Sequence, residues 1–177
     1  MSRRAGRTPT NGVAMDSPIK TPEQLLRYRS LLQIIADRPA IVHSVAPGDT
    51  VFSAVERMAS ANVGFLVVLD GGNLAGVVSE RDYARKVILQ GRASKDTAVR
   101  DIMTRDVVTV TADRTLPECM ALMRDQGFRH LPVVEQARVV AVLSMRDLLR
   151  EIVAHHERVI RDLEVERMTM TIGGSTY

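Results

Sequence analysis

The sequence contains no tryptophan, and aromatic residues make up only 3 % of its 177 positions. Any core must therefore be aliphatic, and the hydrophobic content of 45 % is enough for one core or two small units. The single cysteine, Cys119, excludes an internal disulfide and suits a reducing compartment. No apolar run approaches the roughly 18 residues of a membrane span, and the first twenty residues lack the apolar segment of a signal peptide. We therefore expect a cytoplasmic protein that does not enter membranes.

The net charge is small and comes from the start of the chain. Residues 1–20 contain four basic residues against one acidic residue, which accounts for the whole formal charge of +3. Proteins that bind nucleic acids usually carry basic stripes on the fold itself. We therefore expect no nucleic-acid partner.

Residues 1–20 are rich in Arg, Thr, Pro and Gly and lack hydrophobic periodicity, so we expect a disordered basic tail. Three explanations of this tail stay open: an unstructured start with Met15 as the initiator, a targeting segment, and a basic interaction arm. An N-terminal helix is predicted over residues 21–38. Thr21 suits its N-cap, and Pro22 suits its first turn.

An internal repeat dominates the remaining sequence. An offset of 65 residues, without a gap, aligns residues 50–82 with residues 115–147. Most aligned positions hold the same or a similar residue, as in Met58/Met123, Leu66/Leu131, Val77/Val142, Ser79/Ser144 and Asp82/Asp147. Such a match predicts two copies of one folding unit. We call residues 41–90 copy one and residues 101–153 copy two. Residues 91–100 are expected to link them, and residues 154–177 to form a C-terminal helical extension with a frayed end.

Each copy predicts the order strand, helix, strand, strand, helix. The expected first strands and helices are 41–45 and 50–62 in copy one, and 107–110 and 115–126 in copy two. Two apolar runs follow in each copy. Their connection is a strong hairpin signal at Asp70-Gly71-Gly72-Asn73 and a weaker one at Glu135-Gln136-Ala137-Arg138. Such short sheets need a partner, so we expect an α+β fold in which the two copies pack through their sheets and share a core.

Each copy also places a Ser-x-x-Asp motif directly after its last apolar run, at Ser79–Asp82 and at Ser144–Asp147. One explanation is a helix N-cap, because Ser favours that position and an acid favours the first turn. The other is a ligand site at the same place. A helix N-terminus collects backbone N–H groups that suit anions, and an Asp carboxylate can accept hydrogen bonds from the two hydroxyls of a ribose. The two explanations do not exclude each other.

These residues resemble a tandem pair of cystathionine-β-synthase (CBS) domains, also called a Bateman module. The resemblance covers about residues 41–153. It rests on "NVGFLVVLDGGNLAGVVSERD", on "DIMT" before copy two, on "RHLPVV" and on "AVLSMRD". The chain looks like the small stand-alone bacterial members of the family. The resemblance implies two β-α-β-β-α repeats related by a pseudo-two-fold axis, with added terminal helices and two clefts between the copies. Such clefts take AMP, ADP, ATP, NAD(H) or S-adenosylmethionine.

The resemblance also implies roles for individual residues. Asp147 and Asp82 are expected to bind ribose hydroxyls, and Ser144 and Ser79 to lie beside the ribose or a phosphate. The remaining expected contacts are Arg129 and His130 for phosphate, and Met103, Thr104 and Val108 for the adenine pocket of copy two.

The two copies differ where a ligand is expected. Copy one has Gly64-Phe65 where copy two has Arg129-His130, so we expect the clefts to be inequivalent. Copy two has Ala141 where copy one has Gly76, and the extra methyl group is expected to narrow an approach to the ligand. We expect the cleft with Asp147 to be the stronger nucleotide site. The other cleft is expected to be weaker or to take a different part of a dinucleotide.

No set of residues predicts catalysis or a metal site. His155 and His156 are adjacent on an expected helix, whereas a helical metal pair needs i, i+4 spacing. His130 and Ser144 lack a spacing that would identify a nucleophile and its base. Cys119 aligns with Ala54 on the apolar face of a helix and is expected to be a core residue.

The function predicted from these observations is a regulatory protein that senses AMP, ADP, ATP or NAD(H) and signals to a protein partner by a conformational change. No enzymatic activity is expected. Two alternatives stay open: an interaction scaffold whose clefts are vestigial, and a nucleotide-processing enzyme. The resemblance further implies a homodimer.

Overall fold

The computed structural model describes residues 28–37 and 41–173. Residues 28–158 form one compact unit, and residues 159–173 of the last helix belong to another. Among the described residues, no helix is both long enough and apolar enough to cross a bilayer.

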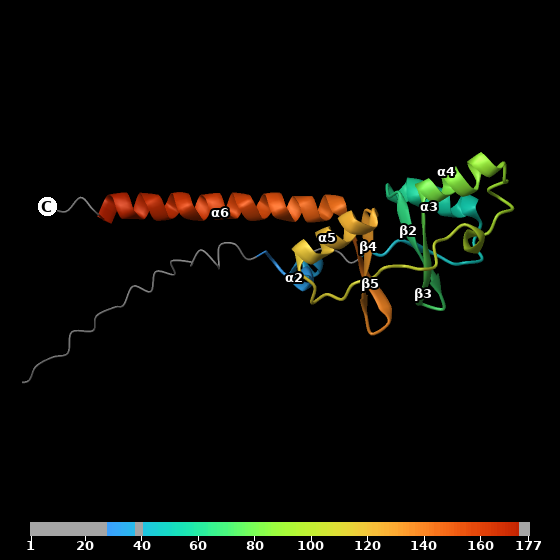
Figure 1. Cartoon of the computed structure of the whole chain (residues 1–177), viewed down its shortest axis with the longest axis horizontal. Coiled ribbons are helices and arrows are strands. Elements are labelled where there is room, and N and C mark those ends of the chain that lie inside the picture. Colours follow the sequence, from blue (N-terminus) through green and yellow to red (C-terminus); the bar gives the residue numbers. More distant parts are fainter. Residues whose placement is uncertain (1–27, 38–40, 174–177) are drawn as a thin grey trace, which may run out of the picture. The chain divides into compact units, whose positions relative to one another are not determined.

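Copy one has the predicted order of elements, shown in Figure 1. They are β1 (Ser44–Val45), α3 (Val51–Ala61), β2 (Phe65–Asp70), β3 (Asn73–Ser79) and α4 (Glu80–Lys86), followed by the 3₁₀ turn η1 (Ile88–Gln90). Strand β1 pairs parallel with β2, and β2 pairs antiparallel with β3. The first strand is thus shorter than the predicted 41–45.

Copy two repeats this order with one strand fewer. It consists of the 3₁₀ turn η2 (Val99–Asp101), α5 (Leu116–Gln126), β4 (His130–Glu135), β5 (Arg138–Ser144) and α6 (Met145–Gly173). The strand predicted over 107–110 is reduced to a single bridge from Val110 to Val133. The bridge is equivalent to the pairing of Val45 with Val68, so the offset of 65 residues also holds in three dimensions.

The first helix of each copy begins after a threonine cap. Thr50 Oγ1 accepts a hydrogen bond from the Ser53 N–H at 3.1 Å, and Thr115 Oγ1 accepts one from the Glu118 N–H at 3.4 Å. Each bond satisfies a donor that the helix itself leaves unpaired. Helices α3 and α5 therefore begin within one residue of the predicted positions.

The terminal helices differ from the prediction. Helix α2 is Leu31–Ala36, with Ser30 and Gln33 forming a capping box. Residues 28–30 are not helical, so one continuous helix over 21–38 is wrong, and the predicted cap at Thr21 lies outside the described residues. Helix α6 runs unbroken from Met145 to Gly173, so no boundary separates copy two from the extension expected at residue 154.

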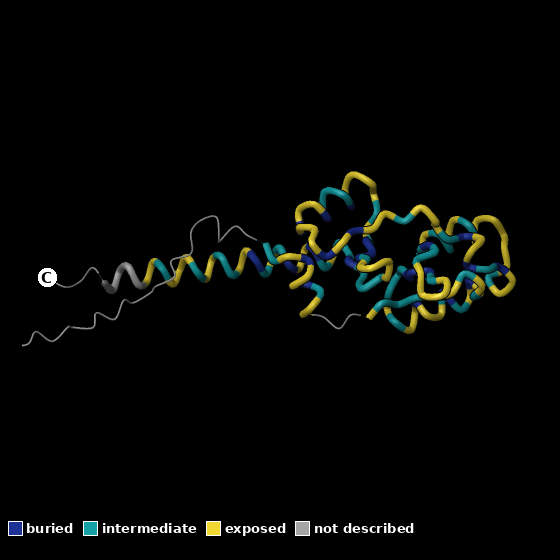
Figure 2. The backbone as a smooth tube through the Cα atoms, turned by 90° about the horizontal axis from the view of Figure 1, so that it is seen from below, coloured by how far each residue is buried: buried dark blue, intermediate teal, exposed yellow. Residues whose placement is uncertain are grey.

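The expected shared core is replaced by two hydrophobic clusters, one in each copy. Each cluster is completed by residues that lie just before, or at the start of, the other copy. Leu31 and Ile34 of α2 are buried in the copy-two cluster, and Val99 and Ile102 are buried in the copy-one cluster. Figure 1 shows α2 beside α5, and Figure 2 shows buried stretches within both copies. The chain thus crosses between the copies on its way into each of them.

Candidate functional site

Both Ser-x-x-Asp motifs form capping boxes. In copy two, Asp147 Oδ2 accepts hydrogen bonds from the Ser144 N–H at 2.9 Å and from the Ser144 hydroxyl at 2.6 Å. Ser144 Oγ in turn accepts the Asp147 N–H at 3.2 Å. Ser79 and Asp82 make the same three bonds at 3.0, 2.6 and 3.3 Å. The capping explanation is therefore confirmed in both copies.

The two aspartates differ in their neighbours one helical turn later. Lys86 Nζ lies 2.8 Å from Asp82 Oδ1 and donates to the Ile102 carbonyl oxygen at 2.6 Å. The position equivalent to Lys86 in copy two is Glu151. Its buried carboxylate forms ion pairs with Arg29 and Arg158. A ribose approaching Asp82 would thus compete with Lys86, whereas the position equivalent to Lys86 in copy two holds an acid.

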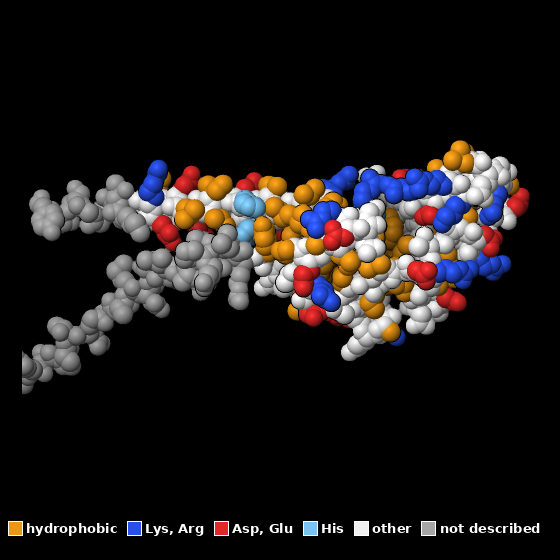
Figure 3. Space-filling model, in the orientation of Figure 1, with side chains coloured by type: hydrophobic (Ala, Val, Ile, Leu, Met, Phe, Trp, Pro, Cys, Tyr) orange, Lys and Arg blue, Asp and Glu red, His pale blue; other side chains and the backbone are white. Residues whose placement is uncertain are grey.

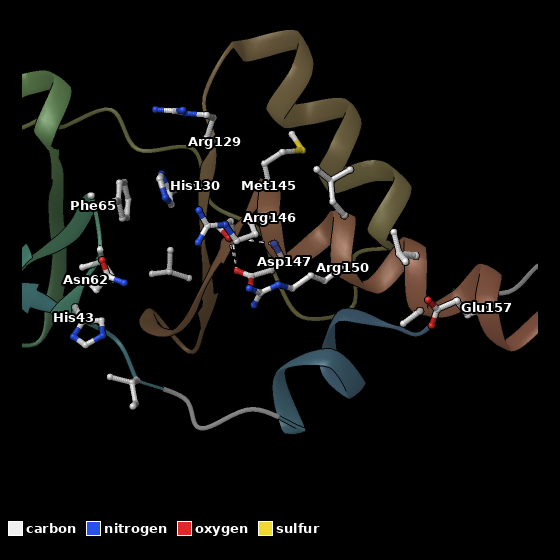
Figure 4. Close-up of a pocket in the computed structure, with 18 residues that line it drawn as sticks. His43, Asn62, Phe65, Arg129, His130, Met145, Arg146, Asp147, Arg150 and Glu157 are labelled. Carbon is white, nitrogen blue, oxygen red and sulfur yellow. Dashed lines mark hydrogen bonds between the residues drawn. The ribbon is translucent and has the colours of Figure 1, made fainter.

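A cavity of about 1030 Å³, which we call the Asp147 cavity, contains the copy-two motif (Figure 4). Both copies contribute to its lining. The polar and ionisable side chains that line it are His43, Asn62, Arg129, His130, Ser144, Arg146, Asp147, Arg150 and Glu157, and the apolar ones include Ile41, Phe65 and Val142. The cavity thus combines a carboxylate and a helix N-terminus with several cationic side chains.

A second cavity, of about 380 Å³, contains the copy-one motif and is called the Asp82 cavity. Its polar and ionisable lining consists of Ser79, Glu80, Arg81, Asp82, Thr104, Asp106, Arg129 and His130, and its apolar lining includes Val77, Val108, Phe128 and Pro132. It is smaller and more acidic than the Asp147 cavity.

The structure corrects the grouping predicted for the adenine pocket. Thr104 and Val108 line the Asp82 cavity, although they were predicted to belong to the pocket of copy two. Met103 lines neither cavity, and its side chain lies against Gly76. The reason is the crossing of the chain: Thr104 and Val77 exchange backbone hydrogen bonds at 2.9 Å, which holds this segment on copy one.

The same crossing brings Ile41 and His43 of copy one into the Asp147 cavity. Sequence reasoning missed both residues. The offset of 65 residues could have found them, because it relates Ile41 to Asp106 and His43 to Val108. Sequence reasoning also missed Arg150 as a lining residue.

Phe65 and His130 form a wall shared by the two cavities. Their rings stack with centroids 4.6 Å apart and an angle of 14° between the planes. They occupy equivalent positions of the repeat, and both line both cavities, as does Arg129. Burial and then the positive charge of Arg129 lower the pKa of His130, against the opposing effect of Asp147. Arg129 and His130 therefore do not belong to one cleft alone.

Gly76 is required by the backbone crossing. A Cβ atom there would lie 2.7 Å from the Thr104 carbonyl oxygen. Ala141 stands at the equivalent position of copy two, but it does not line the Asp147 cavity, so its methyl group does not narrow that cavity. The offset of 65 residues relates Thr104 to Pro39, which lies outside the described residues.

His155 and Cys119 have the surroundings of packed core residues. The His155 ring is buried against Tyr28, with centroids 4.5 Å apart. Burial raises the pKa of the Cys119 thiol to about 11, as suits a core residue. Within the described residues, no three His, Cys, Asp or Glu side chains are grouped so that they could hold a metal ion.

On the face drawn in Figure 3, Lys and Arg side chains gather along the upper edge, whereas Asp and Glu side chains are scattered. The charge of the fold is thus uneven although the chain after residue 20 is neutral in sum.

A family model of the CBS domain matches residues 35–88 and 99–154. The chain belongs to the CBS-domain family. The two matches coincide with the two copies, which confirms the predicted family and the α+β fold of paired repeats. CBS pairs are in general regulatory and bind adenosine-containing ligands.

Similar proteins support this assignment. The mitochondrial CBS domain-containing protein CBSX3 of Arabidopsis thaliana is 41 % identical over 131 residues, which are 71 % of this chain and 61 % of that protein. The chain therefore spans less than two-thirds of that relative. A solved CBS-domain protein from Burkholderia ambifaria MC40-6 is 40 % identical with a TM-score of 0.68, over 71 % of this chain and 95 % of that one.

A third similar structure contains ligands. The CBS domain pair of protein MJ0100 was solved in complex with 5′-methylthioadenosine and S-adenosyl-L-methionine. It is 22 % identical to this chain, with a TM-score of 0.64, over 72 % of this chain and 98 % of that one. At this identity the likeness shows the common fold.

Proposed function

We propose that this CBS pair is a regulatory module that binds an adenine nucleotide in the Asp147 cavity. One observation carries the proposal: the Ser144–Asp147 motif lies in one cavity with Arg146 and Arg150, in addition to Arg129 and His130, which line both cavities. The adenosine compounds bound by the MJ0100 pair support an adenosine-type ligand. AMP, ADP, ATP and NAD(H) all contain the adenosine part that this site requires.

The chemistry of the cavity suits such a ligand. The Asp147 carboxylate accepts hydrogen bonds from ribose hydroxyls, and the N-terminal end of α6 adds a positive potential that favours phosphate. Apolar side chains such as Ile41 and Val142 offer contact surface to the adenine ring.

Signalling is possible because residues of both copies line the Asp147 cavity. A ligand in the Asp147 cavity contacts both copies, so it stabilises the arrangement of the copies to which it binds more tightly. The altered surface would then be recognised by a protein partner. We keep the homodimer predicted from the sequence as part of this proposal.

The test is a thermal-shift and calorimetric titration of the full chain with AMP, ADP, ATP, NAD, NADH and S-adenosylmethionine. A ligand that binds only the folded state adds about 2.7 kcal/mol at a hundred times its Kd, which raises the Tm measurably. Asp147→Asn keeps an oxygen for the capping box but removes the charge, and Asp82→Asn is the matched change in the other cavity. We expect Asp147→Asn to weaken nucleotide binding about tenfold or more and Asp82→Asn to leave it unchanged.

If none of these compounds raises the Tm at millimolar concentration, the proposal is wrong and the interaction scaffold takes its place. Turnover of ATP or NAD by the pure protein would instead support the enzyme. Equal loss of binding in both variants would show that the Asp147 cavity is not the preferred nucleotide site.

A further inference from the structure

The repeat allows the two cavities to be compared position by position. Both contain the Phe65–His130 wall. Four further positions are the same in both: a valine (Val142 and Val77), an arginine (Arg146 and Arg81), and the serine and the aspartate of the motif. Any selectivity between the cavities must therefore come from the positions that differ.

At two equivalent positions the Asp82 cavity has an acid where the Asp147 cavity has an uncharged side chain. Asp106 corresponds to Ile41, and Glu80 corresponds to Met145. At a third position the Asp82 cavity has the apolar Val108 where the Asp147 cavity has the polar His43. The Asp82 cavity thus repels phosphate where the Asp147 cavity does not.

Two arginines of α6 add to this contrast. Arg146 and Arg150 are four residues apart, so they lie on one face of the helix. In Figure 4 both lie beside Asp147, whereas the Arg129 side chain points away from them. Arg81, equivalent to Arg146, lines the Asp82 cavity, but Arg85, equivalent to Arg150, does not.

The Asp147 cavity has fewer acids than arginines, since Asp147 and Glu157 stand against Arg129, Arg146 and Arg150. Asp147 directs Oδ2 to its own helix cap. Glu157, the other acid of the lining, lies farther along α6 in Figure 4.

The volumes agree with the charges. About 1030 Å³ leaves room for a base, a ribose and several phosphates, whereas about 380 Å³ is near the lower end of small-molecule cavities. Lys86 does not line the Asp82 cavity, and its ammonium group forms an ion pair with the Asp82 carboxylate. It is therefore not available to bind a phosphate in that cavity.

We infer that the two cavities sort adenosine ligands by phosphate: the Asp147 cavity takes a phosphorylated one through Arg146 and Arg150, and the Asp82 cavity takes a phosphate-free nucleoside. The inference rests on the proposed function, since it concerns ligands of the same adenosine type. Arg150, whose equivalent Arg85 does not line the Asp82 cavity, and the acids Glu80 and Asp106 of that cavity are then the specificity-determining residues for phosphate. Arg146 contacts phosphate but has Arg81 as its equivalent in the other cavity.

The first experiment titrates the full chain calorimetrically with adenosine, AMP and ADP. We expect two adenosine molecules but one AMP or ADP per chain, with affinity at the Asp147 cavity rising from adenosine to ADP. The double variant Arg146→Gln/Arg150→Gln should weaken ADP about tenfold or more and leave adenosine nearly unchanged. Arg85→Gln, the equivalent exposed arginine outside the cavities, is the matched control and should change neither affinity.

The second experiment transfers side chains between the cavities. Glu80→Met/Asp106→Ile gives the Asp82 cavity the residues that the Asp147 cavity has at these positions. Both acids are exposed, so the fold should tolerate the change. We expect the variant to bind a second AMP per chain, and circular dichroism checks that it remains folded.

Each outcome bears on a different claim. If adenosine and ADP bind equally well, or if the arginine variant weakens adenosine as much as ADP, sorting by phosphate is wrong while the proposed function stands. The same holds if the folded exchange variant still binds one AMP. If no adenosine compound binds, the proposed function and this inference both fail.

Discussion

Gly76 shows at the scale of single residues how the close approach of two chain segments restricts the sequence. Its missing side chain lets the Thr104 backbone pair with β3, and an added Cβ would meet the Thr104 oxygen at 2.7 Å. The Thr104 oxygen belongs to the backbone and the position of a Cβ is fixed by its own backbone, so neither atom can move away cheaply. A glycine in a strand otherwise weakens it, which marks this one as a packing requirement.

Gly76→Ala should therefore lower the free energy of unfolding by about 1–3 kcal/mol, the usual loss from overpacking. Urea denaturation followed by circular dichroism measures it. Gly48→Ala is the control, because nothing lies within 4 Å of its added Cβ. We expect the control to be neutral or slightly stabilising. Equal effects of the two changes would contradict the close approach.

The shared wall makes His130 a titrating residue of the fold. Its pKa is lowered in the folded chain by burial and then by Arg129. In the unfolded chain the pKa returns to about 6.5. The unfolded state therefore binds more protons as the pH falls, so the contribution of His130 to stability is present above about 6.5 and is lost below it.

His130→Phe keeps a ring beside Phe65 and removes the titration. We expect the free energy of unfolding of the variant to fall less steeply than that of the natural chain when urea denaturation is repeated from about pH 8 to about pH 5. His155 also has a lowered pKa and stays in both proteins, so its effect cancels in the difference. Parallel curves would show that His130 has the same pKa in both states.

At the scale of elements, the two hairpins have the same shape with different turn residues. Gly71 and Gly72 have φ of 55° and 88° in copy one, and Gln136 and Ala137 have φ of 47° and 64° in copy two. This left-handed region is open to glycine but costs other residues about 1 kcal/mol each. The weaker hairpin signal of copy two therefore corresponds to a conformational cost at Gln136 and Ala137.

Ala137→Gly should raise the free energy of unfolding by about 0.5–1 kcal/mol, since relief of the left-handed strain exceeds the added freedom of the unfolded chain. Gly72→Ala is the reverse change in copy one, where nothing lies within 4 Å of the added Cβ, and should destabilise. Differential scanning calorimetry measures both. A fall in Tm for Ala137→Gly would mean that the turn is not strained.

The elements that the sequence predicts well have a local cause. Helices α3 and α5 begin after Thr50 and Thr115 because each cap depends on residues three positions apart. The first strands are predicted too long because their pairing depends on a distant partner: Val110 makes one bridge to Val133 and no longer ladder. Strand length is thus decided by the neighbour, which periodicity does not report.

At the scale of the whole molecule, the crossing of the chain explains the errors in the candidate site. The sequence places Val99 in the expected linker and Ile102 in copy two, and no local pattern indicates that both pack in the core of copy one. The motif residues could be predicted, because Ser144 and Asp147 are three positions apart. The grouping of Thr104 and Val108 with Asp82 could not be read from one copy alone, since it arises from packing between copies.

The crossing also predicts how the molecule unfolds. Ile102 precedes the helix of copy two but is only 1 % exposed within the copy-one core, and Ile34 precedes copy one but is 2 % exposed within the copy-two core. Neither core is complete without chain from the other side. The two copies should therefore unfold in one cooperative transition despite their separate cores.

Ile102→Ala and Ile34→Ala should each lower the free energy of unfolding by about 2–5 kcal/mol, the usual range for truncating a buried isoleucine. Ile88→Ala, at a position 57 % exposed, should change it by less than about 0.5 kcal/mol. Urea denaturation followed by circular dichroism should show each buried variant moving the whole transition with its slope unchanged. The contrary result would be two resolved transitions, one shifted by Ile102→Ala and the other by Ile34→Ala. It would mean that each copy folds on its own and that the crossing segments only pack against cores that are already folded.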